Sequence, residues 1–293
     1  MVMTLLLSFS WYVHGFVAGK PVVTDEYLVR FNQLGHSEMP ASENAWPRYE
    51  RAFAALVKPT EELEQTFAFR NDKPSQFRGF AAISAEARKA ISEWLVTNEG
   101  AWAHFTEATH CPYCYRRLDY DPNVSTVPLL LSITTNPSVR QLRYLMKIGI
   151  WRARLAAGEG QLRPAIEDCL AIVRAGRHFQ RSPALIDQLV GVSCGALGRS
   201  ELLRIVSEYD VPASTLDSLE TALIGLFAGG PPPMDFAGER LVILDVVQRT
   251  FTKGGFGGGH LIPGQFSAVL LSTALPKGAR PTVWTRMVFW VLD

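Results

Sequence analysis

The chain has 293 residues, of which 47% are hydrophobic and 19% are charged, and its formal net charge is +1. That length suffices for one large domain or two ordinary ones, and the hydrophobic fraction is enough for a packed core. Neither the net charge nor any block of like charges favours nucleic acid as a partner. Four cysteines are too few for a disulfide scaffold in a chain of this length, so they leave the redox compartment open.

The first segment, residues 2–19, contains no Asp, Glu, Lys or Arg. As a helix it would span about 27 Å, close to the hydrocarbon thickness of a bilayer, so we predict a single-pass membrane anchor. Trp11, Tyr12 and His14 lie inside the run, and no basic residue precedes it. A cleaved signal peptide ending near Val17-Ala18-Gly19 and a buried core helix are therefore the alternatives.

Residues 20–41 are predicted to form a linker with a short helix from Asp25 to Leu34. A helical domain follows over residues 42–228, and an all-α fold is expected throughout. Its first helix has a cap at Ser42 or Asn44 and Pro47 in its first turn. Further helices are expected after Pro59, from Ser84 to a break at Gly100, and from Trp102 to Thr109, with a strand considered over Val127 to Ile133.

The clearest helical pattern runs over residues 138–208. Gly158-Glu159-Gly160 separates one helix from a second, in which apolar residues recur at helical spacing from Leu162 to Val173. Ala153 and Ala165 are small where paired helices would cross, which predicts one tetratricopeptide-like hairpin. No second copy occurs at a fixed period, so a generic irregular helical bundle is an equal alternative.

A third helix is expected to open at Ser182-Pro183, with Gly191 and Gly195 four residues apart. That spacing lets another backbone approach closely, and in membranes it favours helix dimerisation. Charged and polar residues bracket the short apolar run, so we predict tight packing inside a soluble bundle instead.

A further helix from Ser214 to Ala228 is expected to end at Gly229-Gly230 and the following prolines. Residues 229–293 are predicted to be a Pro/Gly-interrupted helical extension, with helices at Phe236 to Phe251, Pro263 to Ala274 and Thr282 to Leu292. The chain stops inside an apolar run. Either that end docks into the core or the sequence is a fragment of a longer protein.

The stretch Glu43-Asn44-Ala45-Trp46-Pro47-Arg48-Tyr49 resembles a recurrent feature of uncharacterised bacterial proteins. Those proteins carry an N-terminal membrane helix before an all-helical body. Cys111 with Leu118-Asp119-Tyr120, and the run from Gln141 to Val190, also look like that group, so the likeness covers roughly residues 1–210. It implies an anchor and a helical domain and supplies no catalytic residues.

The side of the membrane is predicted in two opposing ways. Lys20 and Arg30 follow the apolar segment, which by the positive-inside rule would keep the body of the protein in the cytoplasm. The resemblance implies an extracytoplasmic domain instead. We expect the main domain to lie outside the cytoplasm.

Cys111-Pro112-Tyr113-Cys114 is identical to the active-site tetrapeptide of glutaredoxins. At a helix N-terminus one thiol of such a pair has a lowered pKa, and Arg116 and Arg117 would add positive potential. Glutaredoxins require a strand directly before the motif, whereas a helical pattern precedes Cys111. We therefore predict a disulfide or a pair of buried thiols. A thiol oxidoreductase with Cys111 and Cys114 as catalytic residues is the alternative.

A zinc site is a further alternative for the same region. His110, Cys111 and Cys114 supply three ligands, and His104 would complete the four that structural zinc requires. No second CxxC and no HxxxH pattern supports it. Elsewhere, His178 lies among basic residues that could hold a phosphate, but a solvated helix face is the favoured interpretation: Arg174, Arg177 and Arg181.

No other catalytic motif or dinucleotide fingerprint occurs in the chain. The leading hypothesis is therefore a membrane-tethered helical domain that binds another protein or acts as a scaffold, without a cofactor. An enzyme built on Cys111 and Cys114, or on zinc at His110, is the alternative. The sequence leaves the oligomeric state open.

Overall fold

The computed structural model describes residues 3–5, 7–9, 22–24, 26–66, 85–119, 130–131, 138–252, 259 and 261–262. Within these ranges the regular structure is helical, without a β-strand, which confirms the predicted all-α class. The chain divides into two compact units. One comprises Ser37–Arg116 and Pro137–Met234, and the other Met1–His36, Arg117–Asn136 and Asp235–Asp293.

No described helix is long and apolar enough to cross a bilayer. Of the predicted anchor, the structure describes only helical residues 3–5 and 7–9, so the anchor stays a prediction. The strand considered over 127–133 is wrong at Leu130 and Leu131, the two residues described there, because both are helical. The helices expected from Pro263 to Ala274 and from Thr282 to Leu292 lie outside the described residues.

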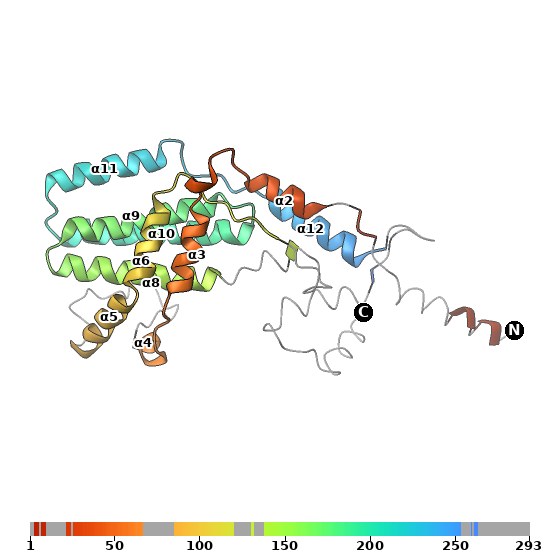
Figure 1. Ribbon diagram of the computed structural model, residues 1–293, viewed down its shortest axis with the longest axis horizontal. Coiled ribbons are helices and arrows are strands. Elements are labelled where there is room, and N and C mark those ends of the chain that lie inside the picture. The colour runs from red at the N-terminus through yellow and green to blue at the C-terminus, as the bar shows by residue number, and fades with distance from the viewer. Residues whose placement is uncertain are drawn as a thin grey trace. The chain divides into compact units, whose positions relative to one another are not determined.

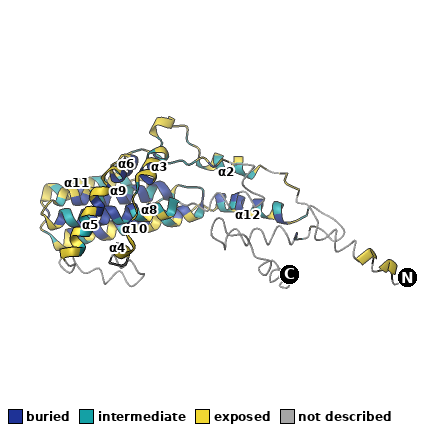
Figure 2. Ribbon diagram, turned by 60° about the horizontal axis from the view of Figure 1, so that its bottom comes forward, coloured by how far each residue is buried: buried dark blue, intermediate teal, exposed yellow. Residues whose placement is uncertain are grey.

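Three consecutive helices form the centre of the first unit: α8 (Ser138–Gly158), α9 (Leu162–Gln180) and α10 (Leu185–Glu208). Connections this short make neighbouring helices antiparallel (Figure 1). The predicted break between the first two is confirmed, and Gly160 provides it with a φ of +78°, which a side chain would oppose. α11 (Ala213–Phe227) follows and ends before Gly230, as expected. Figure 2 shows buried residues concentrated on α8, α9 and α10.

Glycines bring α9 and α10 into close contact, as their spacing predicted. A Cβ on Gly191 would lie 2.5 Å from the backbone nitrogen of Gln180 and 2.6 Å from the carbonyl oxygen of Gly176. A Cβ on Gly176 would lie 2.7 Å from the backbone nitrogen of Gly195. The two helices therefore pack backbone against backbone, and no side chain fits between them at this crossing.

A second group of helices covers α8 and α9: α3 (Trp46–Ala55), α4 (Glu61–Thr66), α5 (Ala85–Thr97) and α6 (Glu99–Thr109). Pro47 lies in the first turn of α3 as predicted, where its missing N–H costs no hydrogen bond, but the capping residue is Ala45 and not Ser42 or Asn44. Tyr49 and Phe105 are fully buried, with ring centroids 5.6 Å apart. This aromatic contact joins α3 to α6.

The break between α5 and α6 falls at Asn98, two residues before the expected Gly100, which lies inside α6. The Asn98 side chain is completely buried. Its Oδ1 accepts from the Val57 N–H at 2.8 Å, and its Nδ2 donates to the Val57 carbonyl at 3.0 Å. The Asn98 amide, with its four hydrogen-bonding positions, connects this break to the backbone of Val57, which a glycine could not do. The helix boundary predicted at Gly100 is therefore wrong because the actual break depends on a contact with Val57, which is distant in the sequence.

The second unit contains α2 (Tyr27–Gly35), where a short helix was expected, and α12 (Ala237–Thr250). The Asn32 amide donates to the Leu118 carbonyl at 2.8 Å and accepts from the Leu118 N–H at 2.9 Å. Asp245 is buried on α12 and accepts a hydrogen bond from the Leu130 N–H at 3.0 Å. Side chains on α2 and α12 thus satisfy backbone groups of other segments in this unit.

Candidate functional site

The Cys111-Pro112-Tyr113-Cys114 turn begins directly after the C-terminus of α6, where His110 is the capping residue. A helix C-terminus carries negative partial charge, which opposes a thiolate. The reactive cysteine of a glutaredoxin-type motif requires the opposite end of a helix. The helical pattern expected before the motif is therefore confirmed as α6, and it places the cysteines where the helix dipole does not activate them.

The turn is held against the start of α3. The Ala45 N–H donates to the Tyr113 carbonyl at 2.9 Å. Asn44 donates from Nδ2 to the Tyr115 carbonyl at 2.8 Å, and its Oδ1 accepts from the Tyr115 N–H at 2.9 Å. The same Oδ1 accepts from the Trp46 N–H at 3.1 Å. One asparagine therefore fixes both the first turn of α3 and the segment that follows the cysteines.

His178 joins three parts of the unit from inside the core. Its Nε2 lies 2.9 Å from the Cys111 carbonyl oxygen, and its Nδ1 lies 2.9 Å from the Tyr49 hydroxyl oxygen. A carbonyl can only accept, so Nε2 carries the proton and Nδ1 accepts from the tyrosine. Burial lowers the pKa of His178 to about 4, which keeps the ring neutral at neutral pH. His178 was expected to lie on a solvated helix face among arginines, but its ring is buried and hydrogen-bonded.

Neither cysteine of the turn is poised as a thiolate. Both are free thiols and partly buried. Burial raises the pKa of the Cys111 thiol, and burial with the nearby Asp187 carboxylate raises the pKa of Cys114 strongly. Arg116 opposes that increase only in part, and its guanidinium lies over the Trp46 ring, 5.4 Å from the centroid. Thiol–disulfide catalysis needs a lowered pKa, so this geometry favours a structural role.

The four residues considered as zinc ligands are not gathered around one point. Across residues 85–119 and the other described ranges, no group of three or more His, Cys, Asp or Glu side chains could hold a metal ion. His104 instead faces Glu107, with its Nδ1 3.8 Å from the carboxylate. His110 is exposed at the end of α6, and the Cys111 thiol faces the Glu107 carbonyl oxygen at 3.9 Å.

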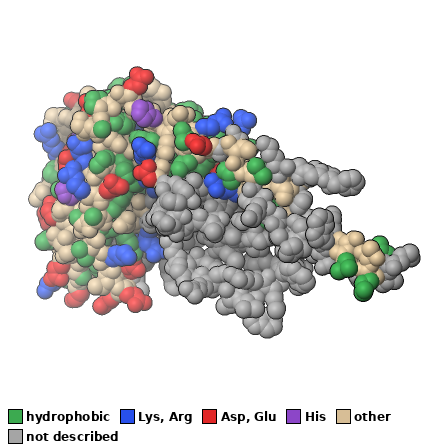
Figure 3. Space-filling view, turned by 45° about the vertical axis from the view of Figure 1, so that its right-hand side comes forward, with side chains coloured by type: hydrophobic (Ala, Val, Ile, Leu, Met, Phe, Trp, Pro, Cys, Tyr) green, Lys and Arg blue, Asp and Glu red, His purple; other side chains and the backbone are tan. Residues whose placement is uncertain are grey.

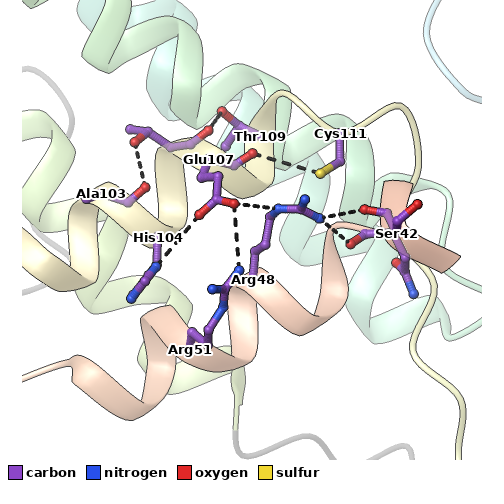
Figure 4. Close-up of polar contacts among 10 residues, drawn as sticks. Ser42, Arg48, Arg51, Ala103, His104, Glu107, Thr109 and Cys111 are labelled. Atoms are coloured by element: carbon purple, nitrogen blue, oxygen red, sulfur yellow. Dashed lines mark hydrogen bonds and ion pairs between the residues drawn. The ribbon is translucent and has the colours of Figure 1, made fainter.

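An ion-pair cluster lies beside the turn on the surface (Figure 4). The Glu107 carboxylate accepts from Arg48 Nε at 2.8 Å and lies 3.7 Å from Arg51. The hydrogen bond from Arg48 lowers the pKa of Glu107. Arg48 also donates to the Ser42 carbonyl at 3.0 Å. Exposed pairs contribute little to stability, so the cluster mainly orients the turn relative to α3 and α6.

Sequence reasoning singled out the Glu43–Tyr49 stretch and the cysteine motif separately and missed that they form one docked unit. The buried linker between them, His178, lies more than sixty residues away in the sequence, and its contact with Cys111 is to a backbone carbonyl. Every residue has a backbone carbonyl, so the residue type at position 111 gives no indication of this contact. The helical spacing of His178 with Phe179 and Ala175 on the buried face of α9 was the only available hint.

The neutral state of His178 predicts acid sensitivity. Above pH 6.5 the ring is neutral in both folded and unfolded chains. As the pH falls from 6.5 towards 4 the unfolded chain binds a proton and the folded chain does not, so the free energy of unfolding decreases. We expect this single group to cost the native state about 3 kcal/mol at pH 4. Urea unfolding at a series of pH values measures it.

His178→Gln is the matched control, because glutamine can donate to the carbonyl and accept from the hydroxyl without titrating. In this variant the free energy of unfolding should decrease less between pH 6.5 and 4, because the contribution of His178 is absent. Burial raises the pKa of Asp168 to about 6, so this group increases the free energy of unfolding as the pH falls from 6 to 4. Because Asp168 is present in both the parent protein and His178→Gln, its contribution cancels when the two pH profiles are subtracted. Parallel pH profiles for the two proteins would contradict the prediction.

Comparisons with known proteins add no relative: no protein-family model, no curated protein and no solved structure matches this chain.

Proposed function

We propose that this chain is a helical protein-interaction domain and that the outer face of α10 is its binding surface. One observation carries the proposal. Most of the buried residues of α10 are glycines or polar residues, with Leu202 and Ile205 as buried aliphatics, whereas five other large aliphatic side chains of the same helix are exposed. The exposed set, called the α10 stripe, is Ile186, Leu189, Val192, Leu203 and Val206.

The stripe has the dimensions of a helix-binding surface. Its members recur at helical spacing over about twenty residues, so at 1.5 Å per residue the stripe is roughly 30 Å long. Leu203 is 71% exposed, and each of the other four is at least 38% exposed. The exposed Arg199 lies between Val192 and Leu203, so the stripe consists of two apolar patches on one helix. Exposed apolar patches of this kind mark an interaction site, and an amphipathic helix of a partner protein would contact both.

The rest of the first unit supports a role in binding rather than in catalysis. α8 and α9 form a hairpin whose small residues, Ala153 and Ala165, are completely buried, in keeping with a tetratricopeptide-like pair that presents the next helix. Acidic and basic side chains are interspersed over the face seen in Figure 3, without a large patch of one sign. Such a surface favours a protein partner over a polyanion.

We further propose that residues 2–19 tether this domain to a membrane and that the domain works outside the cytoplasm. The length and lack of charge of that segment support the tether. The resemblance of Glu43–Tyr49 to membrane-anchored bacterial proteins supports both points. Binding would then take place at a membrane surface, where the tether raises the local concentration of partners.

Site-specific photo-crosslinking tests the α10 surface. A photoreactive residue at position 203 of the full chain should give a discrete adduct with another protein in the membrane fraction of cells that express it. The additional substitution Leu189→Gln should reduce the adduct at least tenfold, because losing the burial of one leucine costs about 1.5–3 kcal/mol. The same residue at position 96 is the control, since Val96 is 74% exposed on α5.

Equal adducts from positions 203 and 96 would show that no specific surface exists. An adduct of twice the chain mass would identify a second copy in place of a foreign partner. Absence of the chain from the membrane fraction after carbonate washing would refute the tether alone. The comparison of the adducts from positions 203 and 96 would still test whether the α10 surface binds a partner.

A further inference from the structure

A groove opens beside the middle of the α10 stripe, at Val192. Its volume is about 440 Å³, and it is lined by residues from the C-terminus of α9, from α10 and α11, and from the segment after α11: Gln180, Val192, Arg199, Phe227, Pro231, Pro232 and Met234. Val192 belongs both to the stripe and to the groove. The walls are mainly apolar, with an aromatic ring, two prolines and a methionine. A bound segment that followed the stripe would therefore reach an apolar pocket.

The groove is also cationic. The guanidinium groups of Arg177 and Arg199 lie over the Phe227 ring, at 5.3 Å and 5.9 Å from its centroid. Burial and the positive charge of Arg181 both lower the pKa of Arg177. Within the described ranges none of these three arginines forms an ion pair, whereas Arg174 pairs with Glu167 on the same helix at 3.4 Å. Arg199 therefore lines the groove and Arg177 lies against the same Phe227 ring, and neither forms an ion pair with a carboxylate among the described residues.

Two hydrogen-bond donors of residues that line the groove, Arg199 and Gln180, lie close to each other beside Gly195. The point where a Cβ on Gly195 would lie is 3.0 Å from Arg199 Nη1 and 3.5 Å from Gln180 Nε2. The absence of a side chain at Gly195 leaves room for both groups. The Nη1 atom of Arg177 is buried and has no hydrogen-bond partner in the part of the chain that the structure describes. Guanidinium and amide N–H groups arranged in this way match the oxygens of a carboxylate.

We infer that the groove formed by Gln180, Arg199 and Phe227 binds an acidic peptide segment of the partner, with an apolar side chain in the pocket and an Asp or Glu carboxylate on Arg199. This inference rests on the proposed function and names the chemistry of the partner. The positive charge of Arg199 favours an Asp or Glu in the bound peptide. The apolar walls of the groove favour an apolar peptide residue next to it. Arg177 also lies against the Phe227 ring and adds positive potential.

Synthetic peptides test the inference on the full chain in detergent. A fluorescein-labelled set has Leu or Phe flanked by Asp and Glu, and a matched set has Asn and Gln in place of the acids. Fluorescence anisotropy should show binding of acidic members, at least tenfold weaker binding of the amide set, and weakening with added salt. Arg199→Gln should reduce affinity about tenfold or more, since a charge-assisted hydrogen bond is lost.

Arg163→Gln is the matched control, because Arg163 is an exposed arginine of α9 outside the groove. It should leave affinity unchanged, and thermal unfolding should show that both variants are folded. Phe227→Leu should weaken binding while keeping the charges, which a purely electrostatic attachment would not do. No binding at about 1 mM peptide, equal binding of the amide set, or unchanged affinity of Arg199→Gln would overturn the inference.

The two proposals fail in distinguishable ways. If the crosslinked partner is lost with Leu189→Gln and retained with Arg199→Gln, the α10 surface binds a partner and the acidic groove does not contribute. If acidic peptides bind but position 203 gives no adduct, the groove is a peptide site independent of the stripe. Competition by inorganic phosphate at equal potency would show that any anion suffices, and would overturn the peptide assignment.

Discussion

Replacing Glu201 by alanine is expected to lower the free energy of unfolding by about 3–5 kcal/mol. Glu201 on α10 accepts two hydrogen bonds from Arg154 on α8, each at 2.9 Å, and both side chains are about 95% buried. Arg204 donates to the same carboxylate at 2.6 Å. Removing the acid leaves the buried Arg154 charge without its partner, which costs more than the pair itself contributes. Urea unfolding followed by circular dichroism measures the loss.

Two further variants separate the charge effect from lost packing. Arg154→Met combined with Glu201→Leu removes both charges and keeps side-chain volume, so it should recover most of the stability lost in Glu201→Ala. Glu208→Ala removes the half-exposed partner of Arg204 and should cost no more than about 1 kcal/mol. A Glu201→Ala variant within 1 kcal/mol of the parent would show that the pair lies in a solvated environment and not in the core.

Adding one methyl group at the crossing of α9 and α10 is expected to have the second large effect. In Gly191→Ala the new Cβ would lie 2.5 Å from a backbone nitrogen and 2.6 Å from a backbone oxygen of α9. Backbone atoms cannot rotate away as a side chain can, so the helices must separate along their contact. We expect a loss of about 2–3 kcal/mol, towards the upper end of overpacking effects.

Gly225→Ala is the matched control for that substitution. Gly225 lies in α11 and a Cβ there would meet nothing within 4 Å. Alanine has the higher helix propensity, so this variant should be neutral or more stable by up to about 1 kcal/mol. Thermal and urea unfolding of the two variants should therefore move in opposite directions. Similar small changes in both would mean that α9 and α10 tolerate a wider separation at the glycines.

The enzyme hypothesis depended on residue types, and the surroundings of those residues weaken it. Cys111 and Cys114 have the spacing of a redox motif, but burial raises their thiol pKa values. The four residues of the motif do not by themselves determine whether the cysteines lie at the N-terminus or the C-terminus of a helix. They also do not determine how exposed the thiols are to water. The same limit applies to His104 and His110, which are close in sequence and are not brought together with the cysteines to hold a metal.

The sequence by itself determined the helical class and most helix ends. The breaks at Gly158–Gly160 and Gly229–Gly230, the start of α3 at Pro47, and the close crossing at Gly191 all follow from local backbone chemistry that residue type controls. Periodicity works for these elements because a helix repeats the same local geometry at every residue. The break at Asn98 depends on the distant backbone of Val57, and there the predicted boundary was wrong.

The tertiary structure decided which faces of those helices are buried. The large aliphatic side chains of α10 were expected to mark an ordinary helix, yet five of them are exposed while glycines and the Glu201 carboxylate are buried beside Leu202 and Ile205. Burial depends on neighbours from distant parts of the chain: Arg154 neutralises Glu201, and α9 fills the space beside the glycines. Local sequence carries no record of those neighbours, so the exposed stripe, the groove beside it and the neutral His178 emerged only when the helices were packed together.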